Sequence, residues 1–400
     1  MKKVKLMMIT LSMMCLVGMS YGQTTQIPDI MFETWLINNG YDSGAPDGFV
    51  LTSNINTIYG LYLWGSNISD LTGIQDFSNL NYLDCGNNSI SNLNITQNQN
   101  LTYLDCSNNQ LGNLFLSINP NLTYLDCRSN QLINIDVTQN VNLTHLDCSY
   151  NQLSNLDVTQ NTNLTDLYCG DNQLNSLNVT QNVNLTNLGC GDNQLNNIDV
   201  TLNPNLTLLS CANNQLYNIN VTQNTNLTDL YCHNNQLYSL NLSQNINLSL
   251  LTCSGNNLLN CLNLKNGNNI NLNLSNLSWG LGNLTCVEVD DSNYSTANWT
   301  NISSNIYFSE NCNNNCSVGV KEVLEDYIII YPNPTTDKIT ISLEEYKNVK
   351  ISIRNSIGQI VLSQETFSNN INLNLIYPKG LYFLQIEIDK QIIHKTIIKS

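Results

Sequence analysis

Positively charged side chains are scarce in this chain. Its 400 residues include 14 Lys or Arg and 3 His against 30 Asp or Glu, for a formal net charge of −16. Residues 23–320 hold two cationic side chains, Arg128 and Lys265, against 21 carboxylates, a net charge of −19. A surface of this sign repels phosphate backbones and anionic headgroups. The composition therefore excludes nucleic acid as a partner and disfavours anionic membranes.

Two further features are missing. No run after residue 22 reaches the ~20 apolar residues that a helix needs to cross a bilayer, so we expect no membrane span. No segment carries a recognisable nucleophile, acid–base pair or phosphate-binding loop, and the shortage of His excludes most His-based catalysis. We therefore expect a protein that is not an enzyme and that needs no cofactor.

The first 22 residues have the pattern of a signal peptide. Lys2, Lys3 and Lys5 precede an apolar run from Leu6 to Val17, and small residues follow at Ser20 and Gly22. This order of basic, apolar and small residues is typical of an export signal. The sequence predicts export and localisation outside the cytoplasm.

Cysteine recurs with a fixed period of 21 residues. A constant period in this range indicates a solenoid, in which each repeat is one coil. The coil 101–121 has the pattern L-x-x-L-x-C-x-x-N-x-L followed by L-x-L-x-x-N. Residues 80–262 thus resemble the leucine-rich repeat family, in its nested 21-residue bacterial subclass, which implies about nine to ten coils. The nine cysteines are Cys85, Cys106, Cys127, Cys148, Cys169, Cys190, Cys211, Cys232 and Cys253.

Each coil alternates inward apolar and outward polar residues in two places, as in L-x-C and in Ile135-x-Val137. Strand side chains alternate in this way, so we expect two short parallel strands per coil, one on each side of the solenoid. Two Asn columns, represented by Asn109 and Asn119, are predicted to bond the turn backbones. The nine thiols are predicted to be buried and free, because a line of parallel thiols suits neither disulfides nor a tetrahedral metal site.

Both ends of the solenoid need covers. Residues 23–79 are predicted to form an N-terminal cap and a first irregular coil, with a short helix capped by Asp29. Residues 263–316 are predicted to form a C-terminal cap. Cysteines in this exported region favour disulfides, and the three possible pairings stay open. The four cysteines are Cys261, Cys286, Cys312 and Cys316.

The composition changes after a predicted linker at residues 317–327. Residues 328–400 are rich in Ile, Lys and Glu and alternate in the way that strands do. Six short strands predict a small β-sandwich. Four segments in order resemble the C-terminal sorting domain of type IX secretion cargo from Bacteroidota. They are 331–335, 353–359, 380–384 and 395–399, with motif residues Tyr331, Pro332, Asn333, Pro334, Gly358, Gly380, Tyr382 and Lys399. The resemblance implies an immunoglobulin-like fold, the type IX machinery as partner, and passage to the outer-membrane surface or the extracellular space.

One outward face of the coils is a candidate binding site. Aromatic residues precede the central Leu and carboxylates follow it in consecutive coils, and coil packing does not require Asp there. A Tyr row beside an Asp row suits an extracellular protein or polysaccharide. The candidate residues are Tyr82, Asp84, Tyr103, Asp105, Tyr124, Asp126, His145, Asp147, Asp166 and Tyr168.

Other interpretations of this face remain open. The carboxylates could serve only to keep the solenoid soluble, which leaves a passive surface-coat spacer. Carboxylates in adjacent coils lie near the separation of a retaining glycoside hydrolase, although an open face does not exclude water. His145 with Asp126, Asp147 and Asp166 offers metal-ligand types, and calcium could bridge the Asp row to a ligand. Adhesion or ligand binding is the function that we expect.

Overall fold

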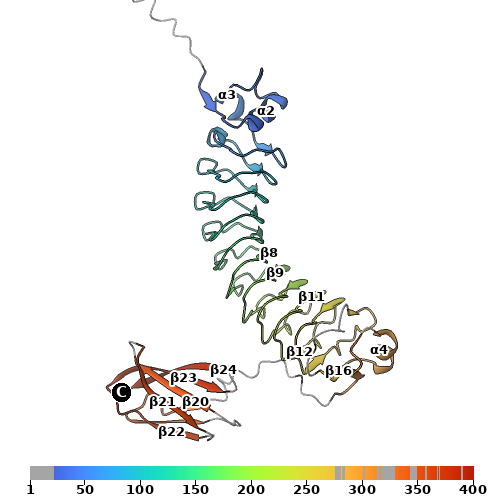
Figure 1. The fold of residues 1–400 in the computed structure, drawn as a ribbon, viewed down its shortest axis with the longest axis vertical. Coiled ribbons are helices and arrows are strands. Elements are labelled where there is room, and N and C mark those ends of the chain that lie inside the picture. The colour runs from blue at the N-terminus through green and yellow to red at the C-terminus, as the bar shows by residue number, and fades with distance from the viewer. Residues whose placement is uncertain are drawn as a thin grey trace, which may run out of the picture. The chain divides into compact units, whose positions relative to one another are not determined.

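The computed structural model describes residues 22–274, 281, 284–300, 302–312, 316, 329–342, 349–355, 358–366, 368, 370–388 and 391–400. The predicted signal peptide up to residue 21 and the predicted linker lie outside these residues. The chain divides into two compact units, Met1–Cys316 and Ser317–Ser400, and each is described by itself (Figure 1).

A small cap begins the first unit. β1 (Thr24–Gln26) pairs antiparallel with β2 (Phe49–Leu51), and α2 (Ile30–Asn38), α3 (Thr52–Ile55) and the 3-10 turn η1 (Ile74–Asp76) complete it. The predicted capped helix is confirmed: Asp29 Oδ1 accepts the amide N–H groups of Met31 and Phe32 at 2.9 and 3.0 Å. Phe32 is fully buried and stacks on Phe77 with ring centroids 5.9 Å apart, so the helix covers the first core layer.

The coils stack in single file and share one parallel sheet of 11 strands (Figure 1). Nearly every strand has three residues, with the central Leu buried and its neighbours outward. The strands are β3 (Gly60–Tyr62), β4 (Tyr82–Asp84), β5 (Tyr103–Asp105), β6 (Tyr124–Asp126), β7 (His145–Asp147), β8 (Asp166–Tyr168), β9 (Asn187–Gly189), β10 (Leu208–Ser210), β11 (Asp229–Tyr231), β13 (Leu250–Thr252) and β15 (Asn273–Leu274).

The second predicted strand of each coil forms only at the C-terminal end of the solenoid. Its sheet contains β12 (Ser239–Asn241), β14 (Cys261–Asn263), β16 (Cys286–Glu288) and β17 (Tyr307–Ser309). In the described coils before Ser239 the corresponding apolar residues, such as Val137, are still buried. In the coil that contains Val137, Asp136 Oδ1 accepts from both the amide and the hydroxyl of Thr138 at 3.0 and 2.6 Å. The equivalent bond, from the Ser243 amide to Asn241 Oδ1 at 3.0 Å, is also present at the end of β12 and does not prevent that strand. The prediction of two strands in every coil was therefore wrong for the coils before Ser239.

The Asn columns bond the turns as predicted. Asn193 is 9% exposed, and its Nδ2 donates to the carbonyl oxygens of Cys169, Cys190 and Gly191 at 3.0, 3.3 and 3.1 Å. Its Oδ1 accepts the amide N–H of Leu174 at 2.9 Å. One side chain therefore joins its own turn to the coil before it, and the same set of bonds recurs along the column.

The predicted burial of the cysteine column is also confirmed. All nine thiols are free and at most 1% exposed. Burial raises the pKa of each thiol, to about 12 for Cys190 and Cys253. These side chains act as small apolar residues of the core.

The nine thiols of the cysteine column should not react with added reagents in the folded protein. We expect a thiol-specific reagent to modify none of the nine thiols in native buffer and all nine after denaturation without reductant, because reaction requires an accessible thiolate. The measurement is a thiol titration of the chain lacking residues 1–22. Substantial labelling in native buffer would contradict the burial of the column.

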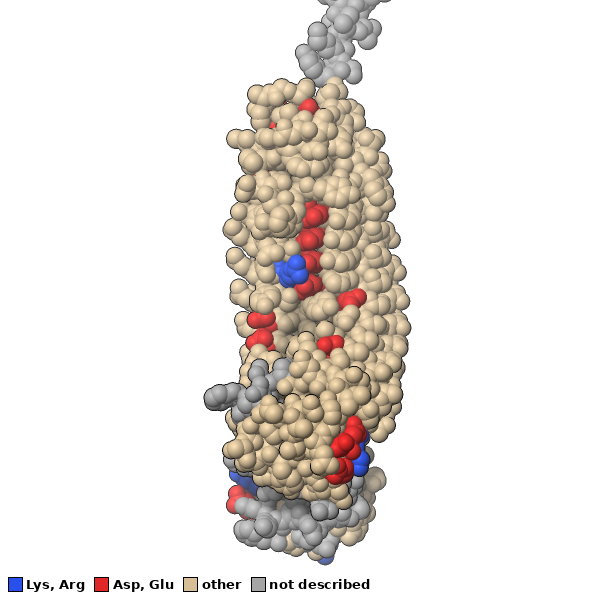
Figure 2. Space-filling model, turned by 90° about the vertical axis from the view of Figure 1, so that its right-hand side faces the viewer, with Lys and Arg blue, Asp and Glu red and all other residues tan. Residues whose placement is uncertain are grey.

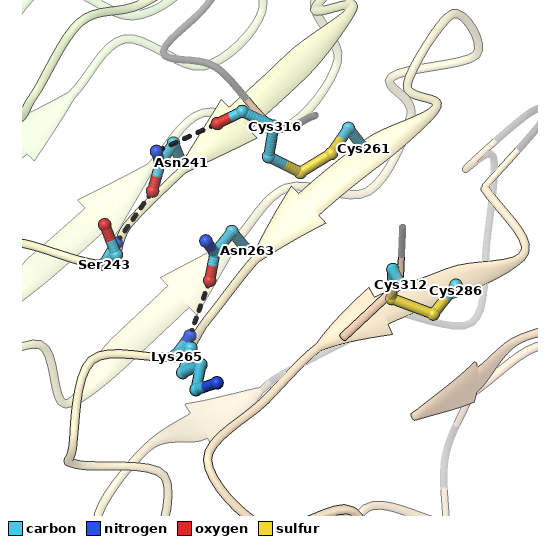
Figure 3. Close-up of a disulfide and its surroundings, with 8 residues drawn as sticks. All are labelled: Asn241, Ser243, Cys261, Asn263, Lys265, Cys286, Cys312 and Cys316. Carbon is cyan, nitrogen blue, oxygen red and sulfur yellow. Dashed lines mark hydrogen bonds between the residues drawn. A yellow bond between two sulfur atoms is a disulfide. The ribbon is translucent and has the colours of Figure 1, made fainter. Parts of the chain in front are cut away.

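Two disulfides close the C-terminal end of the first unit (Figure 3). Of the three pairings left open by the sequence, the structure has Cys261–Cys316 and Cys286–Cys312. Stacking continues past residue 262 to β17, and α4 (Ser292–Asn298) leads to Trp299, whose ring meets Phe308 edge-on at 5.4 Å. The end of the core is thus covered by aromatic rings and held by covalent bonds.

The second unit contains two antiparallel sheets around one core, which confirms the predicted sandwich. One sheet has β18 (Ile329–Tyr331), β19 (Lys338–Ser342) and β22 (Asn370–Asn374). The other has β20 (Val349–Asn355), β21 (Ile360–Thr366), β23 (Gly380–Ile388) and β24 (Gln391–Lys399). Six of these strands match the predicted ones, and β18 is additional. Ile341 and Leu373 from the first sheet and Ile351 and Leu384 from the second share the buried cluster.

Candidate ligand-binding face

The aromatic row forms a continuous ladder of stacked rings. In-register pairing places Tyr82, Tyr103, Tyr124 and His145 one above another on β4 to β7. Their successive ring centroids lie 4.1, 4.2 and 4.4 Å apart, with interplanar angles of 10°, 7° and 4°. The ring faces therefore cover one another, and the ladder offers edges and hydroxyl groups to a ligand. We call Tyr62, Tyr82, Tyr103, Tyr124 and His145 the Tyr ladder.

Tyr62 belongs to the ladder although the sequence pattern does not place it there. It pairs in register with Asp84, in the Asp row, yet its ring centroid lies 4.9 Å from that of Tyr82. Gly60 makes this possible: a Cβ there would lie 3.2 Å from the Tyr62 ring, which folds across the empty position. At the other end the Tyr168 ring is tilted by 51° from His145, and the parallel stacking stops.

The Asp row differs in exposure along its length. Asp126 is 2% and Asp147 is 6% exposed, whereas Asp84 and Asp105 are partly exposed. Each carboxylate bends back to accept the amide N–H two residues later, at distances of 2.9 to 3.2 Å. Ser149 Oγ also donates to Asp147 Oδ1. The interpretation of the acidic row as a solvated face therefore does not hold for Asp126 and Asp147, because these turn bonds draw the carboxylates toward the backbone.

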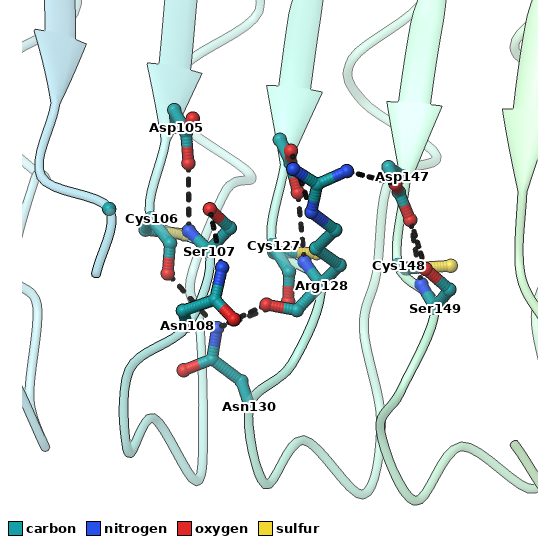
Figure 4. Close-up of polar contacts among 12 residues, drawn as sticks. Asp105, Cys106, Ser107, Asn108, Cys127, Arg128, Asn130, Asp147, Cys148 and Ser149 are labelled. Atoms are coloured by element: carbon teal, nitrogen blue, oxygen red, sulfur yellow. Dashed lines mark hydrogen bonds and ion pairs between the residues drawn. The ribbon is translucent and has the colours of Figure 1, made fainter. Parts of the chain in front are cut away.

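Arg128 lies across the two buried carboxylates (Figure 4). Its Nε is 3.5 Å from Asp126 Oδ2, and its Nη1 is 3.4 Å from Asp147 Oδ2. Figure 2 shows this face as a short line of acidic side chains with one basic side chain beside it, on largely uncharged surroundings. Burial is the main cause that raises the pKa of Asp126 to about 7, and the carboxylates of Asp147 and Asp105 add to it. The positive charge of Arg128 lowers the pKa of Asp126, but by less than burial raises it.

His145 and the remaining acidic candidates do not form a compact cluster. The His145 ring is stacked on Tyr124, and burial lowers the pKa of this imidazole, so it is neutral at pH 7. Asp166 accepts a hydrogen bond from Thr165 Oγ at 2.7 Å and another from Asn187 in the next coil. Within the described residues no group of three or more His, Cys, Asp or Glu side chains is placed to hold a metal ion.

A groove runs beside the Tyr ladder along five consecutive coils. Its volume is about 880 Å³, and its walls are one column of Asn side chains and a second column composed mainly of Thr, with Thr57 and Tyr59 at one end. Asn121 and Thr123 are representative of the two columns, and both are exposed. This groove, Tyr62 and the bridging position of Arg128 were missed in the sequence. The signal for the groove was present, because Asn and Thr recur there with the same period as Cys.

The predicted sorting-motif residues meet within the second unit. Asn333 Nδ2 donates to the Thr396 carbonyl at 2.8 Å, and its Oδ1 accepts the Ile398 amide at 2.9 Å. Lys399 is 8% exposed, and its Nζ contacts Asp337 Oδ1 at 3.2 Å and the Leu375 carbonyl. The first motif, with Tyr331, Pro332 and Pro334, is thereby joined to the last strand.

The other motif residues have structural roles in the same unit. Gly358 has φ of +83°, which favours glycine, and its amide donates to the Asn355 carbonyl at 2.9 Å in the turn after β20. Gly380 begins β23. Tyr382 is 5% exposed, and its hydroxyl donates to the Pro378 carbonyl at 2.7 Å.

Both units of the chain resemble known proteins. Residues 329–400 match the family model described as "Secretion system C-terminal sorting domain". A stretch of 69 residues is 30% identical to "Ulvan lyase NLR42" of Nonlabens ulvanivorans, which is 17% of this chain and 13% of the length of that lyase. The solved "Functional domain of InlJ from Listeria monocytogenes", described as including a cysteine ladder, has a TM-score of 0.51 at 22% identity. That superposition covers 95% of this chain and 99% of the other.

These findings agree with the repeat family and the sorting domain that the sequence indicated. No helix among the described residues is long and apolar enough to span a bilayer. The first unit is a leucine-rich repeat solenoid, and residues 329–400 are a type IX C-terminal sorting domain, which marks the chain for export to the cell surface or the extracellular space.

Proposed function

We propose that this secreted leucine-rich repeat protein is a non-catalytic binding protein that holds an extracellular ligand on the strand face of its N-terminal coils. The Tyr ladder is the observation that carries the proposal. Stacking immobilises the rings before any ligand arrives, so binding loses little side-chain entropy there. Burial is the main cause that raises the pKa of Tyr103, so this hydroxyl is uncharged at neutral pH.

The same geometry argues against a glycoside hydrolase. A retaining hydrolase needs one carboxylate free to attack the sugar and one to donate a proton. Asp126 and Asp147 are nearly inaccessible, and Arg128 and turn amides occupy their oxygens. The partly exposed pair Asp84 and Asp105 also accepts turn amides and lies on an open sheet, where water is not excluded.

The proposal is tested with a variant that removes two rings from the centre of the ladder. The chain lacking residues 1–22 is screened for saturable binding to a panel of extracellular proteins and polysaccharides, with calcium and with chelator. For any ligand found, we expect Tyr103→Ala/Tyr124→Ala to weaken affinity at least tenfold, because contact area and the hydroxyl row are lost.

The matched control is Tyr217→Ala/Tyr238→Ala, which removes two exposed rings elsewhere on the solenoid. It should leave affinity unchanged. A panel without any saturable ligand would favour the passive spacer. Equal affinity of the parent and the ladder variant would place binding on another surface.

A further inference from the structure

We propose that the ligand is an uncharged linear polysaccharide that lies along the groove beside the Tyr ladder, an inference that rests on the proposed binding function. The groove follows the stacking direction over five coils. Its walls, all within the described residues, contain Asn, Thr and one Tyr and no charged side chain. An elongated neutral molecule fits a site of this shape and charge.

The hydrogen-bonding capacity of the walls is biased toward acceptors. Thr123 Oγ donates to the Thr102 carbonyl at 3.1 Å, and Thr144 Oγ donates to the Thr123 carbonyl at 3.1 Å. Asn121 and Asn142 each use one Nδ2 proton on a carbonyl of the preceding coil, at 3.1 and 3.0 Å. A hydroxyl whose proton is engaged can only accept further bonds, whereas the Asn amides retain an acceptor and a donor. A ligand rich in hydroxyl groups can meet both demands.

The spacing of these groups indicates a polymer. The same pair of side chains recurs in each coil at the parallel strand separation of about 4.8 Å. An extended peptide advances about 3.3 Å per residue, so neither one nor two residues match one coil. A sugar in an extended, equatorially linked chain advances by about the length of one ring, which is close to the separation of two coils, so one sugar can lie against each coil.

The aromatic residues support this arrangement. Tyr59 lies at one end of the groove with 65% of its surface exposed, so it offers a free ring face to a sugar ring. The Tyr ladder, whose ring faces are covered, contributes edges beside the groove. The net charge of −19 over residues 23–320 disfavours sulfated or uronic polysaccharides, and a cationic protein would find Asp126 and Asp147 covered.

The experiment uses the chain lacking residues 1–22 and isothermal titration with neutral oligosaccharides of increasing length, such as β-1,4-glucan, β-1,3-glucan and xylan series. We expect one series to bind with affinity that rises with length until about one sugar per lined coil, and that is insensitive to salt. Thr123→Val/Thr144→Val, which removes two hydroxyl acceptors at nearly constant shape, should weaken that binding at least tenfold.

The control Thr207→Val/Thr228→Val deletes hydroxyls of the same column that make the same carbonyl bonds in coils beyond the groove. It should bind as the parent does. Saturable, salt-dependent binding of a charged polysaccharide or protein, with no neutral series bound, would overturn the inference while leaving the binding function intact. Equal binding by both Thr variants would also overturn it. Loss of the entire binding function would instead appear as no saturable ligand in the wider panel.

Discussion

Asn193→Ala should lower the free energy of unfolding by about 4 kcal/mol. The alanine leaves three carbonyl oxygens and one amide N–H without the partner they have in the folded chain, at about 1 kcal/mol for each bond. Because these bonds join two coils, the loss weakens a coil–coil interface as well as one turn. Urea denaturation followed by circular dichroism measures the change.

The control is Asn197→Ala, an exposed position in the same coil. It should change the free energy of unfolding by less than about 0.5 kcal/mol. If both variants unfolded at the same urea concentration, the Asn column would not stabilise the stack in the way that its geometry indicates.

Asp126→Asn should remove a pH dependence of stability that the parent protein shows between about pH 4 and pH 7. The pKa of Asp126 is raised to about 7 in the folded chain, above the ~3.9 of an unfolded Asp. In this window the folded state binds more protons than the unfolded state, so the parent loses stability as pH rises. Three pH units at about 1.36 kcal/mol each give an upper limit of about 4 kcal/mol.

The amide variant stays neutral and should be the more stable protein at pH 8. Urea midpoints of parent and variant at several pH values supply the test. Asp136→Asn is the control, because that carboxyl is exposed and hydrogen bonds from Thr138 lower its pKa. Any effect of Asp136 on the pH dependence of stability therefore lies below about pH 4. Parallel curves for parent and Asp126→Asn would show that the Asp126 carboxyl ionises in both states alike.

Much of the fold could be predicted because the coils repeat. The columns of Leu, Cys and Asn each fix an inward or corner position, and the nine-fold recurrence removes the ambiguity that a single three-residue strand such as β5 would leave. The second strand was predicted for every coil and forms only from Ser239 onward. The pattern of apolar residues, such as Ile135 and Val137, reports which side chains are buried but not whether neighbouring backbones pair.

The candidate face was predicted in outline and missed in detail. Alternation placed Tyr103 and Asp105 outward, but the depth of each side chain depends on neighbours two and twenty-one residues away. Asp126 is buried because its carboxylate turns back and Arg128 covers it, which a pattern of outward positions cannot show. The place of Tyr62 in the ladder depends on the absence of a side chain at Gly60.

The Cys261–Cys316 bond has a consequence for the durability of the protein outside the cell. Fraying and digestion usually begin at a free chain end. Cys316 is the last residue of the solenoid unit, and its sulfur is bonded to the coil that contains β14. After a cut between residues 317 and 328, the solenoid unit is therefore still held by a covalent bond at its last residue. Loss of the sorting domain would therefore not free the C-terminal end of the solenoid, because Cys316 stays bonded to Cys261.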